Sequence, residues 1–222
     1  MKKKNLIITK AAFPASSRNI KLAFIILLGL LLASPSTPSA APSAAFACAC
    51  CAEPGEWYER TEKIESYEIE ELRRVEFGKI ASTYLNAAGF DMLKGFPGEY
   101  ESFALSTTLS PRLALTLTFK GERKETGALV LSLPRVATSF GADLHDAPEG
   151  SAGPILYKEW RFEGLVSGTG IFRKGMARGT KFYLILQGRG NECLSSSDFR
   201  NWRLDINGPR ASYSFYGDLN HP

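Results

Sequence analysis

Residues 201–217, NWRLDINGPRASYSFYG, decide the fold class because they have the pattern of two strands joined by a turn. Apolar residues alternate with polar ones on both arms, and this period of two is typical of strands with one buried face. The alternating apolar residues are Trp202, Leu204 and Ile206 on the first arm and Ala211, Tyr213 and Phe215 on the second. Between the arms, Asn207-Gly208-Pro209-Arg210 has the length of a hairpin loop, and we expect Asn-Gly to supply its positive-φ residues. We therefore predict a β-hairpin with Trp202 in the core.

The same period of two recurs upstream of the hairpin. The further predicted strands are residues 112–119 (RLALTLTF), 127–133 (GALVLSL), 155–162, 164–172 and the almost wholly apolar 182–187, with a turn at Glu163-Gly164 and another at Gly188-Arg189-Gly190. Residues 79–88 fit a helix or a strand equally, and the glutamate-rich residues 53–76 fit a solvated edge strand or a short helix. Short strands without helical repeats between them indicate an all-β fold, an antiparallel β-sandwich or barrel-like single domain with little helix.

The first 47 residues have the features of a secretory signal peptide. A basic stretch ends at Lys21, and the uncharged residues 22–33, LAFIILLGLLLA, follow it. Such a run suits the hydrophobic region of a signal peptide and falls short of the roughly 20 residues that span a bilayer. Ala45-Phe46-Ala47 offers the small-x-small pattern of signal peptidase, so we place the cleavage between Ala47 and Cys48. No transmembrane span is expected after this cleavage.

A mature chain that starts at Cys48 also raises the alternative of lipid anchoring at that cysteine. Such processing needs an apolar residue, usually leucine, three positions earlier, where this chain has Ala45. We therefore favour soluble export of residues 48–222 as one all-β domain, with a periplasmic or extracellular location.

The charge balance argues against a polyanionic partner. Residues 1–47 hold six of the 27 lysines and arginines and none of the 23 acidic residues. The rest of the chain has 21 basic and 23 acidic residues, a formal charge of −2. Because a domain of that balance has no general affinity for polyanions, we expect no nucleic-acid partner.

All four cysteines lie beyond residue 47, as suits a disulfide in an oxidising compartment. Cys48, Cys50 and Cys51 form what we call the N-terminal cysteine cluster, and Cys193 stands alone. We predict a disulfide between Cys193 and one member of this cluster. The alternative is a metal or redox site built on the CxxC spacing of Cys48 and Cys51, but no second pair has matching spacing. We therefore expect no metal ion and no cofactor.

Two groups of residues are candidates for catalysis. They are Glu159 on a predicted strand, and Asp143, His145 and Asp146 in residues 141–154, which we expect to form one long surface loop. No nucleophile motif accompanies the histidine. A glycosidase needs two facing carboxylates, one of them with a raised pKa, whereas Arg161 favours a lowered pKa for Glu159. We expect instead that Glu159 and Arg161 form an ordinary ion pair on the outer face of their strand, and we assign no catalytic residue.

These features together favour an exported, disulfide-bearing domain that binds or scaffolds without catalysis. Its expected partner is an extracellular saccharide or another envelope component, an expectation based on the compartment and on the aromatic-rich strands. One alternative is a small exported glycan hydrolase that uses paired carboxylates, and another is a cysteine-based metal or redox protein. An open aromatic platform, two carboxylates facing one cleft, or converging thiolates would distinguish the three.

Overall fold

The computed structural model describes residues 55–86, 89–96, 98, 100–146, 155–190 and 194–220. The predicted signal peptide, its cleavage site, the N-terminal cysteine cluster and Cys193 lie outside these residues. The helical elements are α1 (Ser66–Arg74) and the 3₁₀ turns η1 (Gly89–Met92) and η2 (Ser196–Asp198). The strands are β1 (Trp57–Lys63), β2 (Glu76–Phe77), β3 (Ile80–Thr83), β4 (Ser102–Leu109), β5 (Ala114–Lys120), β6 (Thr126–Ser132), β7 (Val136–Asp143), β8 (Leu156–Gly170), β9 (Lys181–Gly190), β10 (Phe199–Gly208) and β11 (Ala211–Asn220). The predicted all-β fold with little helix is confirmed.

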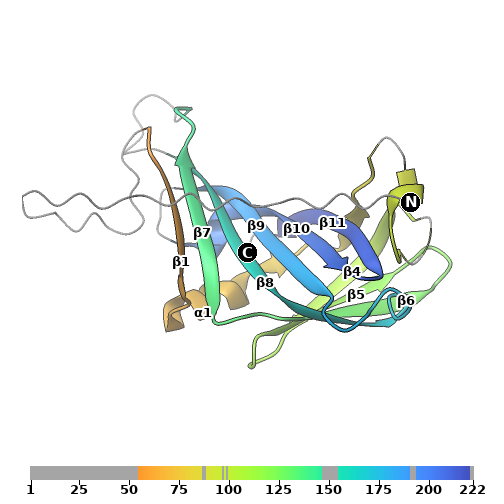
Figure 1. Cartoon of the computed structure of the whole chain (residues 1–222). Coiled ribbons are helices and arrows are strands. Elements are labelled where there is room, and N and C mark those ends of the chain that lie inside the picture. The colour runs from red at the N-terminus through yellow and green to blue at the C-terminus, as the bar shows by residue number, and fades with distance from the viewer. Residues whose placement is uncertain are drawn as a thin grey trace, which may run out of the picture. The chain divides into compact units, whose positions relative to one another are not determined.

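Eight of the strands form a closed barrel. Their order around the ring is β3-β4-β5-β6-β8-β9-β10-β11, and the pairing of β11 with β3 closes it. Every neighbouring pair is antiparallel. Apart from the closing pair β11 and β3, the neighbours follow one another in the chain, with β7 intervening between β6 and β8. Figure 1 shows the green strands β4, β5 and β6 on one side of the ring and the blue strands β9, β10 and β11 on the other. The architecture is an up-and-down barrel.

Strand β8 connects the barrel to an extension of the sheet. Residues 156–161 pair with β7 and residues 166–170 with β6, while β1 pairs with the far side of β7, at the left of Figure 1. The predicted turn at Glu163-Gly164 is wrong, because both residues lie within this one long strand. Gly164 provides space rather than a turn, since a Cβ there would come within 2.8 Å of both the Phe182 ring and the Ser132 carbonyl.

The hairpin of β10 and β11 is confirmed, with a shorter turn than predicted. Gly208 pairs with Ala211, so Asn207 and Gly208 are strand residues, and Pro209 and Arg210 alone form the turn. Neither Asn207 nor Gly208 has the positive φ that we expected. The fixed φ of proline suits the first central position of a common β-turn, which explains why the turn forms there.

Large apolar side chains fill much of the barrel interior. Trp202 is 1% exposed and packs against Phe77 with 5.5 Å between ring centroids, which confirms its place in the core. Phe103, Phe119 and Phe215 contact one another, with centroid separations of 4.7 to 5.8 Å. Such aromatic clusters stabilise a core through both buried area and ring geometry.

The glutamate-rich residues 53–76, which fitted an edge strand or a short helix, contain one of each. The first part of this segment is the edge strand β1, and the second part is helix α1. The Glu68 carboxylate accepts a hydrogen bond of 2.7 Å from the Glu65 N–H, which satisfies a free donor at the helix start. Leu72 anchors the helix to the barrel core. Residues 79–88, which fitted a helix or a strand, contain strand β3.

Candidate functional site

The barrel wall opens between β2 and β4. Strand β3 pairs with β4 over three residue pairs, and the last hydrogen bond on this edge runs from the Leu105 N–H to the Lys79 carbonyl, at 2.7 Å. Before Lys79 the chain pairs with β11 instead, through β2. Strands β2 and β4 therefore diverge from the point where Lys79 and Leu105 are hydrogen-bonded.

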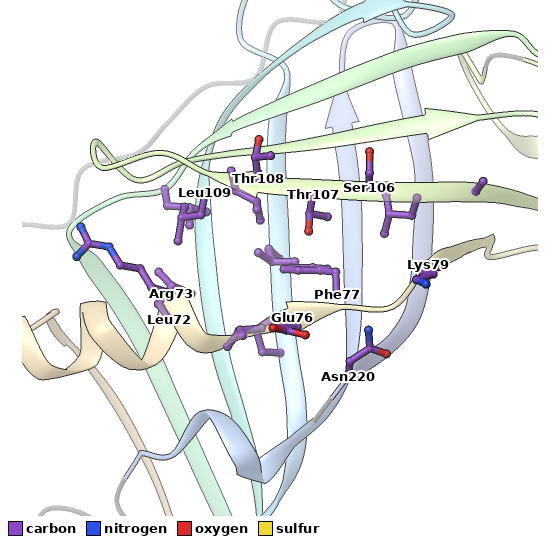
Figure 2. Close-up of a pocket in the computed structure, with 17 residues that line it drawn as sticks. Leu72, Arg73, Glu76, Phe77, Lys79, Ser106, Thr107, Thr108, Leu109 and Asn220 are labelled. Atoms are coloured by element: carbon purple, nitrogen blue, oxygen red, sulfur yellow. The ribbon is translucent and has the colours of Figure 1, made fainter. Parts of the chain in front are cut away.

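A cavity of about 810 Å³ lies behind this opening. Figure 2 shows it between β4 on one side and the end of α1 with β2 on the other. Its walls are mainly apolar and include Leu72, Phe77, Leu105, Leu115, Leu184 and Leu186, which come from both sides of the barrel. The size and the apolar lining are those of a pocket for one small ligand.

Charged side chains lie along one side of the cavity mouth, at the end of α1 and beside β2. Arg73, Glu76 and Lys79 are exposed there, so the mouth carries both signs of charge. Arg73 forms an ion pair of 2.6 Å with Glu70 on the same helix. The site can therefore enclose an apolar group while the polar end of the same molecule stays in water.

Glu159 lies in a hydrogen-bonded network on the outer face of β8. Its carboxylate accepts hydrogen bonds from the Tyr157 hydroxyl (2.5 Å), Arg161 Nε (2.5 Å) and Gln187 Nε2 (3.2 Å). Burial by itself would raise the pKa of Glu159, but these hydrogen bonds outweigh it and hold the pKa below its usual value. The expected ion pair with Arg161 is confirmed. A carboxyl group held ionised in this way is poorly suited to act as a general acid.

Arg161 links this network to an acidic residue on another strand, Glu59 of β1. Arg161 binds Glu159 through Nε and Glu59 through its NH1 group, the latter at 3.3 Å. A guanidinium group thus stands between the two carboxylates, where a paired-carboxylate hydrolase would hold its substrate.

Asp143, His145 and Asp146 lie at the end of β7 and just beyond it. Residues 141–143 were expected in a surface loop, but they continue β7, paired with β8. The Asp143 carboxylate accepts hydrogen bonds from the backbone N–H groups of His145 (2.9 Å) and Gly55 (2.8 Å), while Asp146 binds Arg189. Neither carboxylate orients the imidazole, and no three His, Cys, Asp or Glu side chains in the described residues are placed to hold a metal ion.

A buried ion pair against β9 was not predicted. Lys158 Nζ lies 2.6 Å from the Asp198 carboxylate, and the Lys158 side chain is 3% exposed. Gly188 and Gly190, which we expected in a turn, belong to β9 and make room for η2, because a Cβ on either would overlap Asp198. Two glycines at a spacing of two share one face of a strand, and this was the signal for a close approach of other backbone.

An exposed aromatic pair lies on the outer face of the barrel. Tyr84 and Tyr216 are 55% and 47% exposed, and their ring centroids are 6.5 Å apart. The Arg203 guanidinium lies 5.5 Å from the Tyr84 ring centroid, and its Nε donates a hydrogen bond of 2.9 Å to Asp205. A hollow of about 310 Å³ lies among Tyr84, Arg203 and Asp205. We call Tyr84, Tyr216, Arg203 and Asp205 the aromatic platform, in which the two tyrosine rings meet edge to face.

Comparisons with descriptions of protein families, with curated proteins and with solved structures each found no match to this chain. Within the described residues, no helix is both long enough and apolar enough to cross a membrane.

Proposed function

We propose that this protein is an exported, non-catalytic binding protein whose barrel cavity holds the apolar chain of an envelope amphiphile, such as the acyl chain of a lipid. The observation that carries this proposal is the leucine-lined cavity of about 810 Å³ that opens through the barrel wall. Eight-stranded barrels are wide enough to hold one small ligand. The signal peptide predicted for residues 1–47 would bring the chain to the compartment where such amphiphiles occur.

The lining of the cavity favours an apolar chain over a sugar. Each buried methylene group contributes roughly 0.8 kcal/mol to binding. Saccharide hydroxyls would need hydrogen-bond partners on every side. Ser106, Thr107, Thr108 and Asn220 can offer some, but the leucine and phenylalanine side chains that form most of the walls offer none. Arg73, Glu76 and Lys79 at the mouth would meet the polar end of the ligand.

Binding of fatty acids of increasing length tests the proposal. Octanoate, decanoate and dodecanoate would be titrated into the exported protein by isothermal calorimetry. Each added methylene group is expected to tighten binding about fourfold until the cavity is full. Affinity that does not change with chain length would contradict the proposal.

A matched pair of variants tests the location of binding. Thr107 is half-buried and lines the cavity, whereas Thr118 is exposed on β5 and does not line it. Thr107→Trp puts an indole ring into the cavity and is expected to weaken dodecanoate binding by at least about tenfold. Thr118→Trp is expected to leave it unchanged. An equal effect of both variants would place the binding elsewhere.

The platform of Tyr84 and Tyr216 favours a saccharide as a second candidate ligand. The apolar faces of sugar rings can pack on exposed aromatic side chains, while Arg203 and Asp205 offer hydrogen bonds to the hydroxyls. Titration with oligomers of N-acetylglucosamine tests this candidate. Binding that is lost in Tyr84→Ala and kept in Tyr67→Ala, an equally exposed tyrosine on α1, would support it. No binding by the unmodified protein would contradict it.

A further inference from the structure

The rim of the cavity on the β4 side is a strand edge with which no other described strand pairs beyond Leu105. In an antiparallel sheet, alternate residues direct their N–H and C=O groups to opposite neighbours. The Ser110 N–H donates a hydrogen bond to the Ala114 carbonyl of β5, whereas the Leu105 N–H donates to the Lys79 carbonyl on the opposite edge of β4. The main-chain N–H and C=O groups of the odd-numbered residues of β4 therefore point away from β5. The main-chain groups of Thr107 and Leu109 therefore point into the opening. No strand within the described residues pairs with them on that side.

The opposite rim presents main-chain groups in the same way. The Gly78 N–H donates a hydrogen bond of 2.8 Å to the Asp218 carbonyl, so the even-numbered residues of this segment bond to β11. The N–H and C=O of Phe77 then point toward β4. The opening thus lies between two edges that both carry hydrogen-bond donors and acceptors.

These edges favour a ligand that contains amides. An unpaired N–H or C=O beside apolar side chains costs about as much free energy as a lost hydrogen bond. A bare acyl chain offers these groups no partner. A peptide in an extended conformation does, by adding a strand to the free edge.

We infer that the ligand is an acylated peptide, whose acyl chain fills the cavity and whose extended main chain pairs with β4 at Thr107. This inference rests on the proposed function, because it requires the cavity to take an acyl chain. It narrows the ligand class from amphiphiles in general to those with an amide-linked peptide as the polar end.

Three probes test the inference separately from the proposed function: dodecanoate, N-dodecanoyl-tetraalanine amide, and the same peptide with every amide nitrogen methylated. The methylated peptide keeps the acyl chain but donates no hydrogen bond. The unmethylated peptide is expected to bind about thirtyfold tighter than the methylated one, for two hydrogen bonds to β4. Equal affinities would overturn the inference and leave the proposed function intact. Failure of all three probes to bind would overturn the proposed function.

A variant of the β4 edge tests the position of the added strand. Thr107→Pro removes the N–H that faces the opening and leaves the hydrogen bonds to β5, which other residues make. Thr107→Val keeps this N–H and the shape of the side chain, and it is the control. Thr107→Pro is expected to bind the acylated peptide at least about fivefold more weakly than Thr107→Val, with equal binding of dodecanoate. Equal binding of the peptide by both variants would overturn the inference, and the methylation comparison decides it if the proline variant does not fold.

Discussion

Replacement of Gly188 by alanine tests how the buried ion pair is built. Gly188 lies in β9 opposite Lys158, and η2 packs directly on it. A Cβ at this position would overlap the Asp198 carbonyl and come within 2.6 Å of the Phe199 Cα. Both neighbours are backbone, so the substitution must displace η2 as a whole and cannot be absorbed by a side-chain rotation.

The displacement would separate Asp198 from Lys158. Breaking a buried ion pair typically costs about 3–5 kcal/mol, because a charge is left in a poorly solvated place. We therefore expect Gly188→Ala to lower the free energy of unfolding by about 3–5 kcal/mol. The same replacement at Gly121 is the control, since a Cβ there meets its nearest neighbour, Tyr100, at an ordinary 3.4 Å. Its effect is expected to stay within about 1 kcal/mol.

Urea unfolding of both variants beside the unmodified protein measures these differences. Equal midpoints for Gly188→Ala and Gly121→Ala would refute the reasoning. If Gly188→Ala lowered the free energy of unfolding by less than about 1 kcal/mol, the reasoning would also be refuted. The position of η2 would then not depend on the absence of a side chain at Gly188.

Trp202→Ala is expected to cost about 3–5 kcal/mol in denaturant unfolding, as truncation of a buried aromatic residue does, and a loss below about 1 kcal/mol would remove Trp202 from the core. Burial raises the pKa of Tyr157 to about 12, so the folded protein keeps this phenol neutral while the unfolded chain ionises it near 10. Stability is therefore expected to fall as the pH rises from about 10 to 12, and Tyr157→Phe, compared by urea unfolding across that range, should lose this part of the pH dependence. Non-reducing peptide mapping is expected to link Cys193 to the N-terminal cysteine cluster, and four free thiols would contradict the predicted disulfide. N-terminal sequencing of the exported protein is expected to show a chain that begins near Cys48, and a chain that begins at Met1 would rule out cleavage.

In the predicted strands with clear alternation, the sequence alone determined which side chains face the core. The alternation in residues 112–119 predicted that Leu115, Leu117 and Phe119 share a face, and all three are buried. The pairing of Glu159 with Arg161 and the lowered pKa of Glu159 were predictable for the same reason. Side chains two residues apart on a strand project from the same face, so such contacts depend on local sequence alone.

The tertiary structure decided where strands begin and end and where the wall opens. Gly164 and Gly188 suggested turns, but they lie within strands because Phe182 and Asp198, respectively, pack against them. The barrel closes through the pairing of Thr83 with Phe215. The cavity exists because β2 stays paired with β11 while β4 stays paired with β5, so that β2 and β4 separate. Pairings between residues more than 100 positions apart leave no periodic signal in the chain, because each strand carries only the alternation of its own faces. The sequence therefore predicts the lining of a core, and only the assembled sheet shows where that core is open.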